Sequence, residues 1–175
     1  KLSIECLVNT IRILGKRKDL TWIISGEGPK KNSLMKSLKD FDNVLFYDFQ
    51  PYSKLPYWLN IADIHLIPQK LSSVKFCLPS KLLGILACGK PVIGIAPKGS
   101  ELGNVLDKFG IRLSSESSKK MSESIIKLSD NKELRKRYSE KSKIYISRYY
   151  EKDNVLKNIF KEVKEIIINN QAKNI

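Results

Sequence analysis

The chain alternates between short, almost wholly apolar runs and longer segments in which apolar residues recur every three or four positions. The short runs are typical of strands that helices cover on both faces. They predict strands over residues 20–25, 44–49, 63–68, 91–96 and 111–114. The periodic segments predict helices over residues 3–15, 30–40, 53–62, 79–88, 99–110, 118–129, 132–149 and 153–170. Ser53 is a plausible N-cap for its helix, and residues 69–78 read as a loop.

Strands that alternate with helices predict βαβ units and a parallel sheet. We therefore expect an α/β fold, with helices on both faces of the sheet and extra C-terminal helices. The chain opens on a helix, so a further strand is expected before residue 1. The length of 175 residues suits one domain.

The net charge is +14, but the basic residues are spread along the whole chain. Nucleic-acid sites favour clustered bases, arginine and interleaved aromatic residues, so nucleic acid is not an expected partner. An anionic membrane surface or acidic small molecules fit this charge better. Cys6, Cys77 and Cys88 are odd in number and lack metal-ligand spacing, so we expect core thiols, no metal site and a cytoplasmic location.

The start of the helix at 79–88 carries the most informative chemistry. Pro79 suits the first helical position, and Ser80, Lys81 and Leu82 follow it. A lysine there is unfavourable by about 0.3 to 1 kcal/mol, because the helix N-terminus is already electropositive. A bound phosphate would remove that cost. Lys81 is either a phosphate ligand or a solvated lysine in a lysine-rich chain. Gly89 is expected to end the helix.

Other candidate residues allow two interpretations. Gly26 and Gly28 could admit a ligand close to the backbone or merely end a strand. Ser100 and Glu101 could cap a helix, or Glu101 could bind a sugar hydroxyl. His65 is expected to be a packed or surface ring, and Asp48 has no evident partner. The sequence has no dinucleotide fingerprint or P-loop.

Three stretches together resemble a known family: "WIISGEGPKKNSL" (22–34), "VLFYDFQPYSKLPYWLNIADIHLIP" (44–68) and "LPSKLLGILACGKPVIGIAPKGSELGNVL" (78–106). They are similar to the C-terminal half of a GT-B fold glycosyltransferase of retaining family four, the glycosyl transferases group 1. Within it they resemble bacterial exopolysaccharide, capsule and O-antigen (lipopolysaccharide) sugar transferases. The resemblance implies a Rossmann-like nucleotide-sugar-binding domain over 1–150, whose first strand and glycine turn are missing. It also implies that 151–175 is a helix crossing to an absent N-terminal domain.

The resemblance also implies a donor site. Its residues would be Gly26, Glu27, Gly28 and Pro29 lining the cleft, Phe49, Gln50, Pro51 and Leu55 at the base, Pro79, Ser80, Lys81 and Leu82 at the diphosphate, and Ser100 and Glu101 near the sugar or distal phosphate. Lys81 would be the catalytic residue, because it would stabilise the departing diphosphate. No metal or other cofactor is implied.

The sequence departs from the family at two positions. Many members carry two glutamates eight positions apart, and the second glutamate binds the ribose. Phe76 and Gly84 occupy these positions, and neither side chain can accept a hydrogen bond. Ribose recognition is then left to Glu101 or to a backbone group, or donor affinity is low.

The expected function is therefore that of a donor-binding domain. The enzyme would transfer a sugar from a nucleotide-diphospho-sugar to a lipid-linked or polysaccharide acceptor, in cell-surface glycan biosynthesis. It would be cytoplasmic, with peripheral association at the inner face of the membrane, and the isolated fragment would be inactive. The alternatives are a non-catalytic remnant that binds a nucleotide or a partner protein, a GT-B-type sugar-nucleotide epimerase and, more distantly, a nicotinamide dehydrogenase.

Overall fold

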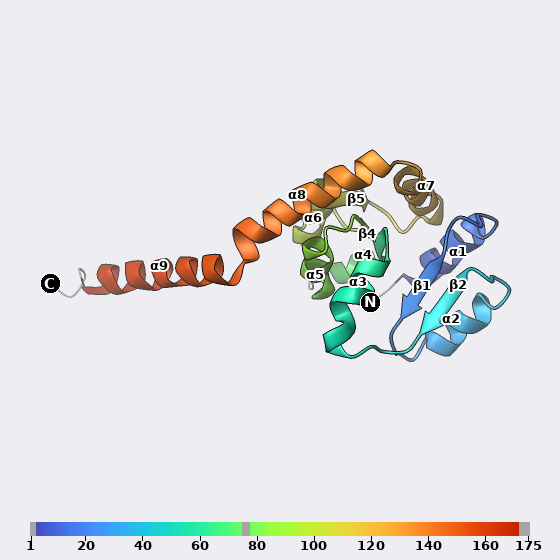
Figure 1. The fold of residues 1–175 in the computed structure, drawn as a ribbon, viewed down its shortest axis with the longest axis horizontal. Helices are drawn as coiled ribbons and strands as arrows, with labels where there is room; N and C mark the ends of the chain where they lie inside the picture. The colour runs from blue at the N-terminus through green and yellow to red at the C-terminus, as the bar shows by residue number, and fades with distance from the viewer. Residues whose placement is uncertain (1–2, 75–77, 172–175) are drawn as a thin grey trace.

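The computed structural model describes residues 3–74 and 78–171, which form an α/β fold with a long C-terminal extension (Figure 1). Its first half contains α1 (Ile4–Leu14), β1 (Trp22–Ser25), α2 (Lys31–Ser37), β2 (Val44–Tyr47), the 3-10 turn η1 (Tyr52–Lys54), α3 (Leu55–Ile61), β3 (His65–Ile67) and α4 (Leu71–Val74). Its second half contains α5 (Lys81–Ala87), β4 (Val92–Ile95), α6 (Glu101–Phe109), β5 (Gly110–Leu113), α7 (Ser118–Ser129), α8 (Lys132–Tyr150) and α9 (Lys152–Gln171).

The described strands form two parallel sheets, with the orders β1-β2 and β3-β4-β5. In the first, Trp22 is in register with Val44. In the second, Val92 lies between His65 and Gly110. The expected parallel α/β architecture is confirmed. Its division into two sheets was not predicted, because periodicity identifies strands without identifying their neighbours.

Two clusters of buried side chains make up the core. One packs α1, α2, β1, β2 and α7 against β4 and β5, and the other packs α5 and α6 against β3 and β4. Every residue of β4 is buried. The long helix α8 runs along α5 and α6, and α9 then projects away from the body (Figure 1).

Several local predictions need correction. Ser53 caps no helix, because Pro51 opens a 3-10 turn (Lys54 N donates to the Pro51 carbonyl at 2.9 Å) and α3 begins only at Leu55. The loop expected at 69–78 contains the short helix α4. Pro79 is not the first helical residue, because α5 begins at Lys81 with Ser80 as its N-cap.

Other local predictions are confirmed. Gly89 has φ +68° and follows α5, as expected for a helix-ending glycine. Cys6 is buried in the core, and the pKa of its thiol is raised by that burial. Cys88 is a free, half-buried thiol. Cys77 lies outside the described residues.

Candidate functional site

Hydrogen bonds join several chain segments at the carboxyl end of the three-stranded sheet, where open α/β sheets bind ligands. The Ser3 amide donates to the Pro68 carbonyl at 2.7 Å, so the start of α1 lies against the end of β3. The Glu116 carboxylate, which follows β5, accepts from the Ser3 hydroxyl and from the Leu71 amide. These bonds lower the pKa of Glu116 from its ordinary value. The sequence gives no sign of this role, because its partners lie 113 and 45 residues away.

The first turn of α5 contains Lys81 and Leu82, and Ser80 precedes it as the N-cap. All three residues were expected at the diphosphate. Leu82 is fully buried and anchors the turn, and its amide donates to the Pro79 carbonyl at 2.9 Å. Ser80 and Lys81 each retain exposed surface, although nearby protein partly desolvates the Lys81 ammonium itself. In the described part of the chain Lys81 makes no ion pair, and desolvation by the surrounding protein lowers the pKa of its ammonium. The turn therefore offers a positive charge that the described residues leave uncompensated.

The turn after β1 is open and bears charge. Gly26 has φ +133°, a conformation that side-chain-bearing residues rarely adopt, whereas Gly28 does not have positive φ. A Cβ placed on either glycine would meet nothing within 4 Å, so the backbone here is accessible. Glu27 and Pro29 are both exposed. Only Gly26 uses the positive φ that a glycine allows, and the turn leaves room for a ligand close to the backbone.

Lys31 binds the carboxylates of Glu27, at 2.7 Å, and Asp48. These contacts raise the pKa of Lys31, with Asp48 the larger cause, and lower the pKa of Asp48. Asp48 thus has a partner, contrary to the prediction. The four-residue spacing of Glu27 and Lys31 could have indicated the first pair. No local signal indicates the second.

The segment after β2 forms an exposed aromatic surface. Phe49 is 74% exposed and Leu55 is 38% exposed. Gln50 is half-buried, and its side chain donates to the Asp48 carbonyl at 3.1 Å. Tyr52 and Tyr57, which no sequence motif marked as site residues, are 86% and 75% exposed. Pro51 is also exposed, so the expected base-flanking residues lie together on an accessible segment.

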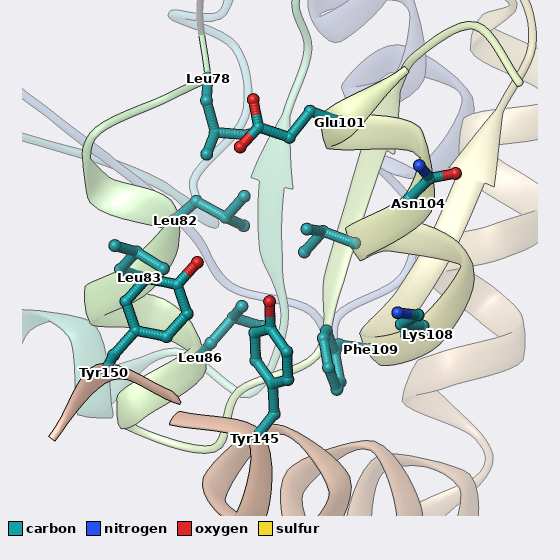
Figure 2. A pocket seen from close by; sticks show the side chains of 11 residues that line it. Leu78, Leu82, Leu83, Leu86, Glu101, Asn104, Lys108, Phe109, Tyr145 and Tyr150 are labelled. Atoms are coloured by element: carbon teal, nitrogen blue, oxygen red, sulfur yellow. The ribbon is translucent and has the colours of Figure 1, made fainter. Parts of the chain in front are cut away.

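The start of α6 lies at the opening of a cavity of about 140 Å³ between α5, α6 and the end of α8. Ser100 caps α6 by accepting from the Gly103 amide at 3.0 Å, as predicted. Figure 2 shows the Glu101 carboxylate at the opening beside Leu78, with the hydroxyls of Tyr145 and Tyr150 pointing inward. Leu82 lines the same cavity, so two of the expected site residues from different helices share it.

Two positions, 76 and 84, were expected to stand where the resemblance implies a pair of glutamates. Phe76 lies outside the described residues. Gly84 is half-buried on α5, and a Cβ there would lie 3.0 Å from Cδ1 of the buried Leu59 on α3. A side chain at position 84 would therefore require the Leu59 side chain on α3 to shift by a few tenths of an ångström.

His65 is packed, as predicted. Its Nε2 lies 2.9 Å from the Leu59 carbonyl. The pKa of the imidazole is lowered, mainly by burial. Among residues 3–74 and 78–171, no group of three or more histidines, cysteines and carboxylates is placed to hold a metal ion. None of the helices described is long and apolar enough to cross a membrane.

The fold matches that of the C-terminal domains of GT-B glycosyltransferases. Residues 4–145 match the model of the family "Glycosyl transferases group 1", and the chain belongs to that family.

Among curated proteins, the chain is 29% identical over 163 residues to the putative colanic acid biosynthesis glycosyl transferase WcaI of Escherichia coli K12. The match covers 90% of this chain and 40% of that protein, so the chain spans less than half the length of this relative.

Solved structures share the fold at low sequence identity. The C-terminal domain of the glycosyl transferase group 1 family protein LpcC from Francisella tularensis is 17% identical, with TM-score 0.66, and the match covers 85% of this chain and 79% of that one. Anabaena Alr3699/HepE in complex with UDP-glucose is 13% identical, with TM-score 0.71, and the match covers 92% and 44%.

Proposed function

We propose that this chain is the C-terminal, donor-binding part of a retaining glycosyltransferase of family four. The whole enzyme would transfer a sugar from a nucleotide-diphospho-sugar to a lipid-linked or polysaccharide acceptor in cell-surface glycan biosynthesis. Residues 1–150 would bind the donor, and 151–175 would cross to the acceptor-binding part of a longer protein.

The proposal rests mainly on the position and the uncompensated charge of Lys81. Its ammonium stands in the first turn of α5 and has no ion-pair partner among the described residues. Desolvation disfavours the charged ammonium, and a nearby anion offsets that cost. A diphosphate at this point would accept hydrogen bonds from Lys81 and from backbone amides at the start of α5.

The proposed contribution to catalysis is stabilisation of the departing diphosphate. Charge builds up on that group as the bond to the sugar breaks, and a positive group already in place lowers the barrier. The exposed turn at 26–29 and the aromatic segment at 49–57 would border the nucleotide, and Glu101 would reach the sugar. No metal or other cofactor is part of the proposal.

The relatives support the choice of substrates. The name of WcaI refers to colanic acid biosynthesis, and the HepE structure contains UDP-glucose. Exposed apolar residues form a stripe on α9, as needed to pack against another part of the protein: Leu156, Ile159, Phe160, Val163, Ile166 and Ile167. The net charge of +14 favours peripheral contact with an anionic cytoplasmic membrane face.

A second candidate function rests on Gly84. Position 84 is a glycine, so the ribose-binding glutamate that the family resemblance implies would have no equivalent there. A nucleotide-binding remnant without transferase activity would fit this loss. Sugar transfer by the full-length protein would exclude that candidate.

Calorimetric titration of the full-length protein with UDP, GDP, ADP and NAD tests the proposal. A nucleoside diphosphate should bind, and Lys81→Ala should weaken it about 5- to 150-fold, equivalent to about 1–3 kcal/mol for a charge-assisted contact. Lys127→Ala, which removes an exposed lysine from α7, is the matched control and should bind as the wild type does. Binding of NAD alone, or unchanged binding by Lys81→Ala, contradicts the proposal. Residues 1–175 alone should transfer no sugar.

A further inference from the structure

The cavity of about 140 Å³ between α5, α6 and the end of α8 has walls that are mostly apolar. Leucine, valine and phenylalanine side chains form its sides: Leu82, Leu83, Leu86, Val105 and Phe109. An apolar cavity of similar volume can hold a molecule the size of benzene, so this one has room for a small substituent of a larger ligand. The proposed function assigns no group to this space.

The cavity opens beside the residues proposed to bind the diphosphate. Leu78 and Leu82, which stand on either side of residues 79–81 in the sequence, both line it. Glu101, at the start of α6, lies at the same opening beside Leu78 (Figure 2). A sugar that is attached to a diphosphate at Lys81 and contacts Glu101 would therefore lie over the opening, with one substituent directed inward.

Polar side chains at the opening and inside the cavity limit what that substituent can be. The ionised Glu101 carboxylate only accepts hydrogen bonds, so it needs an N–H or O–H donor. The hydroxyls of Tyr145 and Tyr150 point into the cavity from α8 (Figure 2). Asn104 and Lys108 complete the lining on α6 and are exposed to solvent.

The two tyrosines can donate a hydrogen bond to a ligand. Their ring centroids lie 5.7 Å apart. The pKa of Tyr145 is raised from its ordinary value, first by a hydrogen bond with the Tyr150 side chain and then by burial. Two hydroxyls that share one hydrogen bond retain one further hydrogen between them. The pair can therefore donate that hydrogen to an acceptor inside the cavity.

An acylamino group on the sugar matches all three parts of the cavity at once. Its N–H would donate to the Glu101 carboxylate, its carbonyl oxygen would accept from the tyrosine pair, and its methyl group would lie against the apolar walls. A plain hydroxyl would suit Glu101 but leave the apolar walls without a partner. The methyl group of a deoxy sugar would suit the walls but leave the tyrosine hydrogen and the carboxylate unpaired, which is costly where water is excluded.

We propose that the donor sugar carries an acylamino substituent, such as the acetamido group of an N-acetylhexosamine, and that this cavity binds it. The proposal rests on the donor site proposed above and adds the class of sugar that this site accepts. Tyr145 and Tyr150 then determine which sugar is bound, whereas Lys81 binds the diphosphate that all such donors share.

Calorimetric titration of the full-length protein tests the proposal, with the glucose and N-acetylglucosamine derivatives of UDP, GDP and ADP as ligands. With the nucleotide that binds, the N-acetylglucosamine derivative should bind at least about 10-fold more tightly than the glucose derivative. The double variant Tyr145→Phe/Tyr150→Phe keeps both rings and should reduce this preference about 3- to 10-fold, because the acyl oxygen loses its donor. Val105→Phe fills part of the cavity and should remove the preference.

A matched control is Tyr149→Phe. The Tyr149 ring centroid lies 5.1 Å from that of Tyr145, but Tyr149 is not among the described residues that line the cavity. This variant should keep the full preference for the N-acetylglucosamine derivative. Titration of each variant with the free nucleoside diphosphate shows whether the fold and the diphosphate contacts are retained.

The outcomes separate this proposal from the proposed function. Equal binding of the two sugar derivatives, or tighter binding of the glucose derivative, would overturn the acylamino proposal and leave the donor site in place. A preference that is unchanged in both cavity variants would also overturn it, because the acyl group would then bind elsewhere. Failure of every nucleotide to bind would overturn both proposals.

Discussion

The strands β1 and β4 have the same length and similar apolar sequences, yet their surroundings differ. All four residues of β4 are buried, and it has a neighbour on each side. In β1, Trp22 is buried while Ile23 and Ser25 are exposed, and it has one neighbour among the described residues. The burial of an apolar strand therefore depends on what pairs with it and covers it as much as on its own residues.

The largest difference in the free energy of unfolding is expected when one isoleucine in each strand is replaced by alanine. Ile93 is 0% exposed and Ile23 is 38% exposed, and each is the second residue of its strand. Ile93→Ala should lower the free energy of unfolding by about 2–5 kcal/mol, because it leaves a cavity in a packed core. Ile23→Ala should cost about 1 kcal/mol or less. Urea denaturation measures both, and equal losses would refute the contrast.

The next largest difference in stability is expected when a glycine in each region is replaced by alanine. A Cβ on Gly110 would lie 1.8 Å from the Val92 carbonyl oxygen of β4, whereas one on Gly28 would meet nothing within 4 Å. Gly110→Ala should destabilise the protein by about 1–3 kcal/mol, because β4 and β5 must separate. Gly28→Ala should be close to neutral. Thermal unfolding of both variants tests this, and a neutral Gly110→Ala would contradict it.

The helix caps provide a smaller difference. Ser100 caps α6 beside the three-stranded sheet, and α2 beside the two-stranded sheet has no side-chain cap. Ser100→Ala should cost about 1 kcal/mol, because the Gly103 amide loses its acceptor. Ser33→Ala, at an exposed position of α2, should stay within about 0.5 kcal/mol of wild type. Chemical denaturation of the two serine variants would show whether the cap matters.

The smallest effect should come from an exposed ionic contact that joins the two regions. Arg17, before β1, binds Asp19 and, at 2.8 Å, Asp130 at the end of α7. The Arg17 contact lowers the pKa of Asp130 from 3.8. A carboxylate with a lowered pKa stabilises the fold above its ordinary pKa, and this contribution disappears as the pH falls below it.

Asp130→Asn should therefore be slightly less stable than wild type at neutral pH, and the difference should vanish as the pH falls below 3.8. Denaturation midpoints across this range measure it. Glu123→Gln is the control, because this exposed carboxylate of α7 makes no ion pair in the described part of the chain. A difference that is unchanged at low pH would show that the ion pair is not its source.

Local signals in the sequence predicted local structure well. Apolar runs located all five strands of the described chain, and Ser100 and Gly89 identified the ends of two helices. The cap of α3 was predicted wrongly, because Ser53 competes with a 3-10 turn opened by Pro51. The cap and turn signals act over three or four residues, which is the range of the backbone hydrogen bonds in helices and turns.

Features that depend on distant partners could not be predicted. Lys31 meets Asp48 across 17 residues, and Glu116 meets Ser3 across 113. The division into two sheets also depends on which strands become neighbours, and apolar periodicity does not encode that choice. The cavity shared by Leu82 and Glu101 arises only when α8 places Tyr145 beside both helices.

The closeness of Leu59 to position 84 affects which substitutions that position can accept. A glutamate introduced at position 84 alone would press its carbon stem into Leu59, a buried side chain of α3. Either the Leu59 side chain must shift, or a smaller residue at position 59 must make room, and the smaller residue would weaken the packing of α3 on α5. Introducing a glutamate there therefore depends on the residue at position 59 as well as on position 84.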